Sequence, residues 1–124
     1  MARRPTPTLT EAEYRLMDIL WDLGSGTVAD VHARLASRPL AYTTVLSTLT
    51  ILERKGYVRH SVRGKANVYE PRIARDAARR SVVENVLTTF FEGSPRALML
   101  NLLESERLSA EEEQRLRSLL EDAD

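Results

Sequence analysis

The chain has 124 residues, of which 43% are hydrophobic and 29% are charged, with 18 basic and 18 acidic side chains in balance. This composition is typical of a folded domain, or of a small domain with an appendage, and not of a disordered chain. The absence of cysteine excludes disulfides and thiolate metal sites. No apolar run approaches the ~20 residues of a membrane-spanning helix, and the first residues lack a signal peptide's apolar stretch. We therefore expect a cytoplasmic protein.

The neutral total conceals an uneven distribution of charge along the chain. Residues 1–72 contain 11 Lys and Arg against 7 Asp and Glu, whereas residues 73–124 contain 7 against 11. Within the first part, residues 40–72 hold 6 basic and 2 acidic side chains. A basic segment beside an acidic one favours a nucleic-acid face on one part of the chain, although ordinary surface variation gives the same pattern.

The chain is predicted to begin with a flexible arm over residues 1–8, which contain two arginines and two prolines. Thr10 and Glu13 then form a capping-box pattern, which predicts the start of a first helix. The glycine-containing turn at residues 24–26 predicts its end.

Two further helices are expected before the pattern changes. Thr27, with Asp30 three residues later, repeats the capping box and predicts a short helix over residues 28–36. A third helix is predicted over residues 42–55, and Gly56 is well placed to end it. Apolar side chains spaced three and four residues apart predict its buried face: Tyr42, Val45, Leu49 and Leu52.

A β-hairpin is predicted next. Residues 57–62 and 66–70 are rich in β-prone side chains, and the turn Arg63-Gly64-Lys65 separates them. The hairpin therefore carries a basic tip, and Pro71 ends it.

The remaining sequence has a helical pattern from residue 73 onward. Gly93 ends a long helix, Ser94 opens the next, and Ser109 with Glu112 forms a capping box for the last. We therefore expect a mainly α protein with a small hairpin, divided into a winged helix-turn-helix domain over residues 9–72 and a helical dimerisation domain over residues 73–124.

Three helices followed by a hairpin predict a DNA-binding function, because the third helix of such a domain enters the major groove. Hydroxyl and methyl groups early in that helix would face bases, while basic groups at its end and on the hairpin tip would meet the backbone. A winged helix that docks onto a protein is the alternative from another class. The expected DNA contacts are Tyr42, Thr43, Thr44, Ser47, Thr48, Arg54, Lys55, Arg63 and Lys65.

The tail is expected to make a homodimer. Its apolar side chains are too many for short helices extending from a small head, and an exposed patch of them would be adhesive. Folding back onto the head of the same chain is the alternative. The expected interface consists of Val86, Phe90, Phe91, Leu98, Met99, Leu102, Leu103, Leu116 and Leu119.

Three segments carry a resemblance to a known family: LTEAEYRLMDILWDLGSGTVADVHARL, LAYTTVLSTLTILERKGYVRHSVRGKANVYEP and SVVENVLTTFFEGSPRALMLNLLESERLSAEEEQRLRSLL. Together they are similar to the penicillinase-repressor (BlaI/MecI) family, over about residues 8–120. The resemblance implies a homodimer whose tails pair and whose two heads bind a palindromic operator, which blocks transcription. It maps the recognition helix onto residues 42–55 and the wing onto residues 59–69.

The chain departs from many family members at the positions that would face DNA. Some members carry Lys or Arg where Thr43 and Leu46 stand, and many carry Arg, Lys or Asp near Thr50 and Ile51. The operator preference of those members therefore does not transfer to this chain.

The resemblance also implies a route of inactivation. In the best-known members, a pathway involving a membrane sensor protease cuts the tail between Asn and Phe. This junction falls here on Asn101 and Leu102, so the first residue matches and the second does not. The alternative is that Asn101 is only a polar residue on a packed helix and marks no cleavage site. The copper-responsive branch of the family ends in paired cysteines, which this chain lacks.

Catalytic and metal sites are not expected. His32 and His60 lie in different predicted elements, without metal-ligand partners at suitable spacing. The sequence contains no nucleophile–histidine–acid set and no glycine-rich phosphate loop. We therefore expect neither an enzyme nor a bound cofactor.

Overall fold

The computed structural model describes residues 8–35, 37–105 and 107–122. Of the predicted arm, all but Thr8 lies outside the described residues. The chain divides into two compact units between Val82 and Val83, a boundary that falls inside helix α4.

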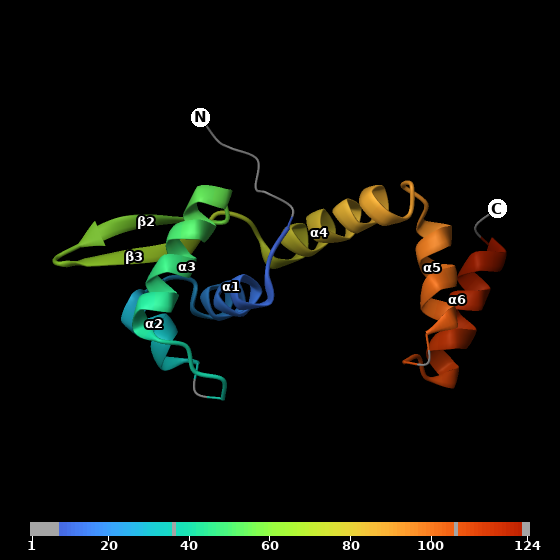
Figure 1. Ribbon diagram of the computed structural model, residues 1–124, viewed down its shortest axis with the longest axis horizontal. Coiled ribbons are helices and arrows are strands. Elements are labelled where there is room, and N and C mark those ends of the chain that lie inside the picture. The colour runs from blue at the N-terminus through green and yellow to red at the C-terminus, as the bar shows by residue number, and fades with distance from the viewer. Residues whose placement is uncertain (1–7, 36, 106, 123–124) are drawn as a thin grey trace. The chain divides into compact units, whose positions relative to one another are not determined.

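In its described residues, the first unit contains three helices, a small sheet and the first turns of a fourth helix. Figure 1 shows the hairpin extending away from the helices. The predicted fold class, mainly α with a small wing, is confirmed. The elements are α1 (Glu11–Leu23), β1 (Gly26–Thr27), α2 (Val28–Ala33), α3 (Tyr42–Lys55), β2 (Val58–Arg63), β3 (Ala66–Pro71) and α4 (Arg75–Phe90).

The hairpin is attached to the helices through a strand that the sequence did not reveal. The sheet has the order β1-β3-β2, and both pairings are antiparallel. Tyr69 of β3 pairs with Gly26 on one side and with His60 on the other. The base of the hairpin is therefore held against the turn that leads from α1 to α2.

Local sequence determines where the first two helices begin. The Thr10 hydroxyl accepts from the amide of Glu13 at 3.1 Å, and the Glu13 carboxylate accepts from the amide of Thr10 at 2.7 Å. Thr27 and Asp30 form the same reciprocal pair. Both capping boxes satisfy amides that a helix start otherwise leaves unbonded. Helix α2 ends at Ala33, earlier than the predicted limit at residue 36.

The core of the first unit forms where α1, α2 and α3 meet the sheet. Tyr42, predicted on the buried face of α3, is instead 49% exposed and packs edge-on against His32. Because Tyr42 is the first residue of the helix, its side chain lies beyond the packed region. The fully buried large side chains are Leu16, Met17, Leu20, Val31, Val45, Leu49, Leu52, Tyr57 and Val58.

The start of α4 belongs to the first unit. The Trp21 indole donates to the carbonyl of Ile73 at 2.9 Å, and the Arg75 guanidinium lies 5.3 Å from the Trp21 ring centroid. Arg75 also pairs with Asp22 at 2.9 Å, and Ala78 is buried in the core. The first turns of α4, which the sequence assigned to the tail, therefore contact the head.

The second unit contains the rest of α4, α5 (Pro95–Glu104) and α6 (Ala110–Asp122). Ser94 caps α5 by accepting from the amide of Ala97 at 3.0 Å. The Arg96 guanidinium donates to the carbonyl of Leu120 at 3.2 Å and joins α5 to α6. No described helix combines the length and the apolar character that are needed to cross a membrane.

Candidate nucleic-acid interface

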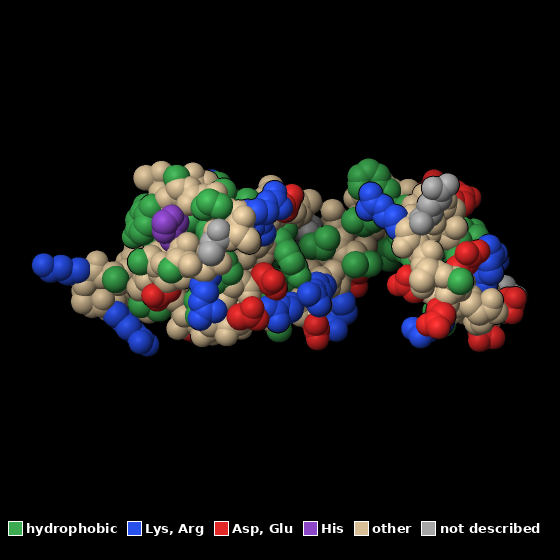
Figure 2. All heavy atoms as spheres, turned by 90° about the horizontal axis from the view of Figure 1, so that it is seen from below, with side chains coloured by type: hydrophobic (Ala, Val, Ile, Leu, Met, Phe, Trp, Pro, Cys, Tyr) green, Lys and Arg blue, Asp and Glu red, His purple; other side chains and the backbone are tan. Residues whose placement is uncertain are grey.

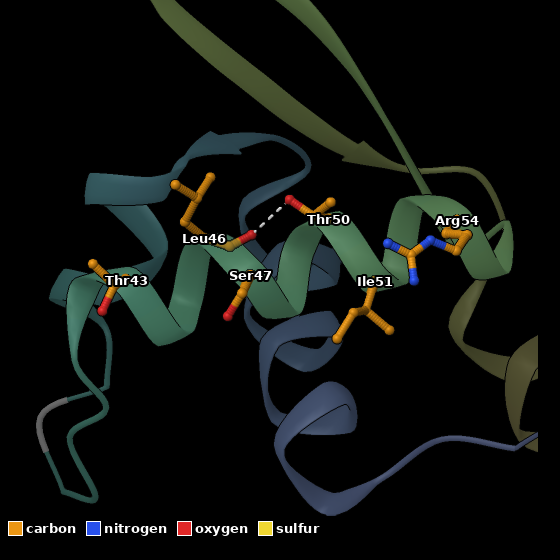
Figure 3. Close-up of a pocket in the computed structure, with 6 residues that line it drawn as sticks. All are labelled: Thr43, Leu46, Ser47, Thr50, Ile51 and Arg54. Carbon is orange, nitrogen blue, oxygen red and sulfur yellow. Dashed lines mark hydrogen bonds between the residues drawn. The ribbon is translucent and has the colours of Figure 1, made fainter.

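The outer face of α3 is a candidate surface for reading DNA. Val45, Leu49 and Leu52 anchor the opposite face in the core, so the intervening positions point outward. Figure 3 shows these side chains in two rows, each advancing by four residues. They line a shallow hollow and comprise Thr43, Leu46, Ser47, Thr50, Ile51 and Arg54.

Two hydroxyl groups of this face, those of Ser47 and Thr50, are bonded to the helix itself. The Ser47 hydroxyl donates to the carbonyl of Thr44 at 3.1 Å, and the Thr50 hydroxyl donates to the carbonyl of Leu46 at 2.9 Å. Short polar side chains form such back-bonds when they lie inside a helix. With their protons used in this way, these two oxygens face outward as acceptors.

One of the predicted contact residues faces inward. Thr48 is only 8% exposed, and its hydroxyl donates to the carbonyl of Thr44 at 2.7 Å. Its position is three residues after Val45 and four before Leu52, which places it on the core side of α3. Thr48 therefore does not belong to the outward face, and this part of the prediction is corrected.

Lys55 is engaged within the head. Its ammonium lies 2.8 Å from the Glu13 carboxylate and donates to the carbonyl of Thr8 at 3.2 Å. Burial alone raises the pKa of Glu13, but hydrogen bonds from Lys55 and from the amide of Thr10 outweigh it and lower that pKa below its usual value. Lys55 thus joins the end of α3 to the start of α1, and its ammonium is not a free charge at the DNA face.

The hairpin places two basic side chains at its tip. Gly64 adopts a φ of +63° in the turn, and the flanking Arg63 and Lys65 are exposed. Figure 2 shows basic side chains extending into solvent at this end of the molecule. Among the described residues, neither of the two forms an ion pair, whereas Arg59 on the same hairpin pairs with Glu70 at 2.6 Å.

The hairpin and α3 meet at a second hollow. Tyr42 and Leu46 from α3 line it together with Lys65 and Asn67 from the hairpin and the first residues of α2. The structure therefore brings the start of the predicted recognition helix and the wing to one surface. Leu46, Thr50 and Ile51 line this surface; from the sequence they were named only as positions of departure from the family and were left out of the expected contacts. Asn67 was not predicted, and only the folded hairpin brings it beside Leu46.

Comparisons with known proteins agree with this geometry. The family model described as "Penicillinase repressor" matches residues 9–122. This chain belongs to the penicillinase repressor family. The "Penicillinase repressor" of Bacillus licheniformis is 27% identical, over 94% of this chain and 91% of that protein. The "Transcriptional regulator BlaI" of Mycobacterium tuberculosis is 34% identical, over 90% of this chain and 82% of the relative.

A solved structure extends the likeness to the head. The solution structure of the DNA binding domain of the repressor BlaI covers 60% of this chain and 93% of its own, with a TM-score of 0.54 and 25% identity. The resemblance to the penicillinase repressor family that the sequence motifs indicated is confirmed. The family is one of transcriptional repressors.

The second unit of this family member presents apolar side chains to solvent. Phe90 is 73% exposed, and Leu102 and Leu119 are also exposed. The other predicted interface residues are partly buried: Val86, Phe91, Leu98, Met99, Leu103 and Leu116. The predicted junction, Asn101 and Leu102, lies on exposed positions of α5.

The histidines are not brought together by the fold. Nδ1 of His60 lies 2.7 Å from the carboxylate of Glu53, and His32 packs against Tyr42. Among the described residues, no group of three or more His, Cys, Asp or Glu could hold a metal ion.

Proposed function

We propose that this protein, a DNA-binding transcriptional repressor, places α3 in the major groove of its operator and its hairpin tip against the adjacent backbone. The observation that carries the proposal is the single surface formed by the outer face of α3 and the hairpin. A major groove is wide enough to admit one helix, and a winged domain presents its recognition helix in this way.

The charges on this surface suit a phosphate backbone. Arg63 and Lys65 lie on the exposed hairpin tip, and Arg54 lies at the end of the outer face of α3. Cations that neutralise phosphates release counterions, so binding should weaken steeply as salt rises. Thr43, Thr44 and Ser47 lie on the exposed side of α3, where base edges would approach.

The repressor is proposed to act as a homodimer on a palindromic operator. Phe90, Leu102 and Leu119 are large apolar side chains that the second unit leaves exposed. A two-fold symmetric contact between two copies would cover them. Two linked heads would then bind two half-sites about one helical turn apart, with an avidity that one head lacks.

Cleavage in the tail is proposed as the means of release. Asn101 and Leu102 are exposed within α5, and a cut between them would detach the remainder of α5 and all of α6 from the chain. The dimer would lose part of its interface and the operator would be freed. A sensor protease is the proposed partner for this step. A cytoplasmic location, a non-catalytic role and the lack of a cofactor complete the proposal.

Selection of bound sequences from a random pool of duplex DNA tests this function. We expect enrichment of a palindrome that the full chain then binds more tightly than random DNA. If no sequence is enriched and the protein binds no duplex at low salt, the DNA-binding proposal fails. The winged domain would then be a protein-docking module.

A further inference from the structure

Two aliphatic side chains, Leu46 and Ile51, lie exposed on the outer face of α3 that is proposed to meet DNA. Leu46 is 41% exposed and Ile51 is 38% exposed, on opposite edges of the face. The polar groups between them, Ser47 and Thr50, have donated their protons to carbonyls of the same helix. Between Thr43 and Arg54, this face therefore offers mainly methyl groups and two acceptor oxygens.

This chemistry excludes two common ways of reading bases from the centre of α3. Guanine is read by paired hydrogen bonds from Arg or Lys, and adenine by paired hydrogen bonds from Asn or Gln. The segment Tyr42–Lys55 contains no Asn or Gln, and its Arg and Lys occupy only the last turn. What remains for an aliphatic side chain in the major groove is the 5-methyl group of thymine.

We propose that Leu46 and Ile51 select the operator by packing against thymine methyl groups, so that each half-site carries thymines beneath the centre of α3. The inference rests on the proposed DNA-binding function and names the feature of the DNA that is read. Duplex DNA is favoured as the occupant because basic groups flank this apolar face: Arg54 lies at one end, and Lys65 lies beside Leu46 at the second hollow.

Operators containing deoxyuridine test the inference directly. Uracil keeps every hydrogen-bonding group of thymine and lacks only the methyl group. For each thymine that is read, we expect the uracil operator to bind about fourfold more weakly per half-site, and about fifteenfold when both half-sites are changed, because one buried methyl group contributes about 0.8 kcal/mol. Filter binding or fluorescence anisotropy measures the difference.

Variants of the protein identify which side chain reads which thymine. The Leu46→Ala variant and the Ile51→Ala variant should each bind the thymine operator more weakly than the wild type. Each should also lose the discrimination between thymine and uracil at the base that the replaced side chain contacts. Both side chains are on the surface, so an unchanged thermal unfolding midpoint should verify that the variants fold. Val83→Ala is the matched control, because Val83 is an exposed aliphatic side chain on α4 in the second unit and belongs neither to α3 nor to the hairpin. It should keep the full discrimination.

The outcomes separate the two proposals. If the enriched operator binds equally well with thymine or uracil, the inference is wrong while the DNA-binding function stands. If Leu46→Ala and Ile51→Ala weaken both operators equally, these side chains contact something other than thymine methyl groups, and the inference is again wrong. If no operator is enriched at all, the proposed function fails first, and a protein partner for this apolar face takes its place.

Discussion

Removing the two cations of the hairpin tip should change how the repressor responds to salt. Arg63 and Lys65 are exposed and, among the described residues, form no ion pair, so their charges are available to phosphates. If each neutralises one phosphate in each of two protomers, the double variant R63A/K65A loses about four phosphate contacts, and the slope of log K against log salt becomes shallower by about 3.6. Between about 50 and 200 mM salt, the wild-type protein should therefore lose about 150-fold more affinity than the variant.

The assay is a titration of DNA binding at several salt concentrations, on the enriched operator and on a random duplex. The slope should change equally on both, because phosphate contacts carry no sequence information. The double variant R115A/R117A is the matched control, since it removes two exposed cations from α6 in the second unit. A hairpin variant whose slope equals that of wild type, while the control behaves as expected, would refute the assignment of the wing.

Three further predictions follow from contacts inside the two units. A fragment of residues 1–82 should fold, sediment as a monomer and bind a palindrome far more weakly than the full chain. A dimeric 1–82 fragment would contradict the tail interface. A fragment ending at residue 71 should in addition be less stable than the 1–82 fragment, because it lacks the partners of Trp21. Glu13→Gln should lower the free energy of unfolding by about 1–3 kcal/mol at neutral pH, since it leaves Lys55 without its counter-charge. Because the pKa of Glu13 is lowered in the folded state, the stabilisation is present above the usual glutamate pKa and is lost as pH falls through the folded value. Urea unfolding should therefore show the free energies of unfolding of the wild type and the variant converging in acid. A difference that stays constant with pH would contradict the ion pair. Thr48→Val should leave operator affinity unchanged, whereas Thr44→Ala should weaken binding to the operator more than to random DNA. Equal losses of affinity on both duplexes would mean that Thr44 contacts the DNA backbone and not a base.

Sequence patterns predicted the starts of the first two helices, because the interactions that fix these starts involve residues close together in the chain. The capping boxes at Thr10 and Thr27 depend on a partner three residues away, so a sequence window contains the whole interaction. The order of helices and hairpin followed from the same short-range signals. Even the inward position of Thr48 was present in its spacing from Val45 and Leu52, and was missed because its hydroxyl was interpreted as a contact for DNA.

Contacts between segments that are distant in the sequence could not be predicted from such local patterns. The strand β1 exists only because Gly26 pairs with Tyr69. The extension of the head into α4 depends on the bond from Trp21 to Ile73, 52 residues further along the chain. The pairing of Lys55 with Glu13 likewise joins the end of α3 to the start of α1. Each of these depends on which surfaces meet in the folded chain, and side-chain periodicity does not carry that information.

Two side-chain contacts at the end of α3 would allow the proposed base reading and backbone binding to act together. Lys55 ties this end to α1 through Glu13, and Glu53 ties it to β2 through His60. The start of the helix, in contrast, is held by packing and by the ring contact between Tyr42 and His32. Because one end of α3 is fixed to both the rest of the head and the hairpin, a phosphate bound at the hairpin tip would restrain where the helix lies in the groove. Side chains as short as threonine and leucine could then select bases, because they would reach the base edges only if the helix is held at one depth in the groove.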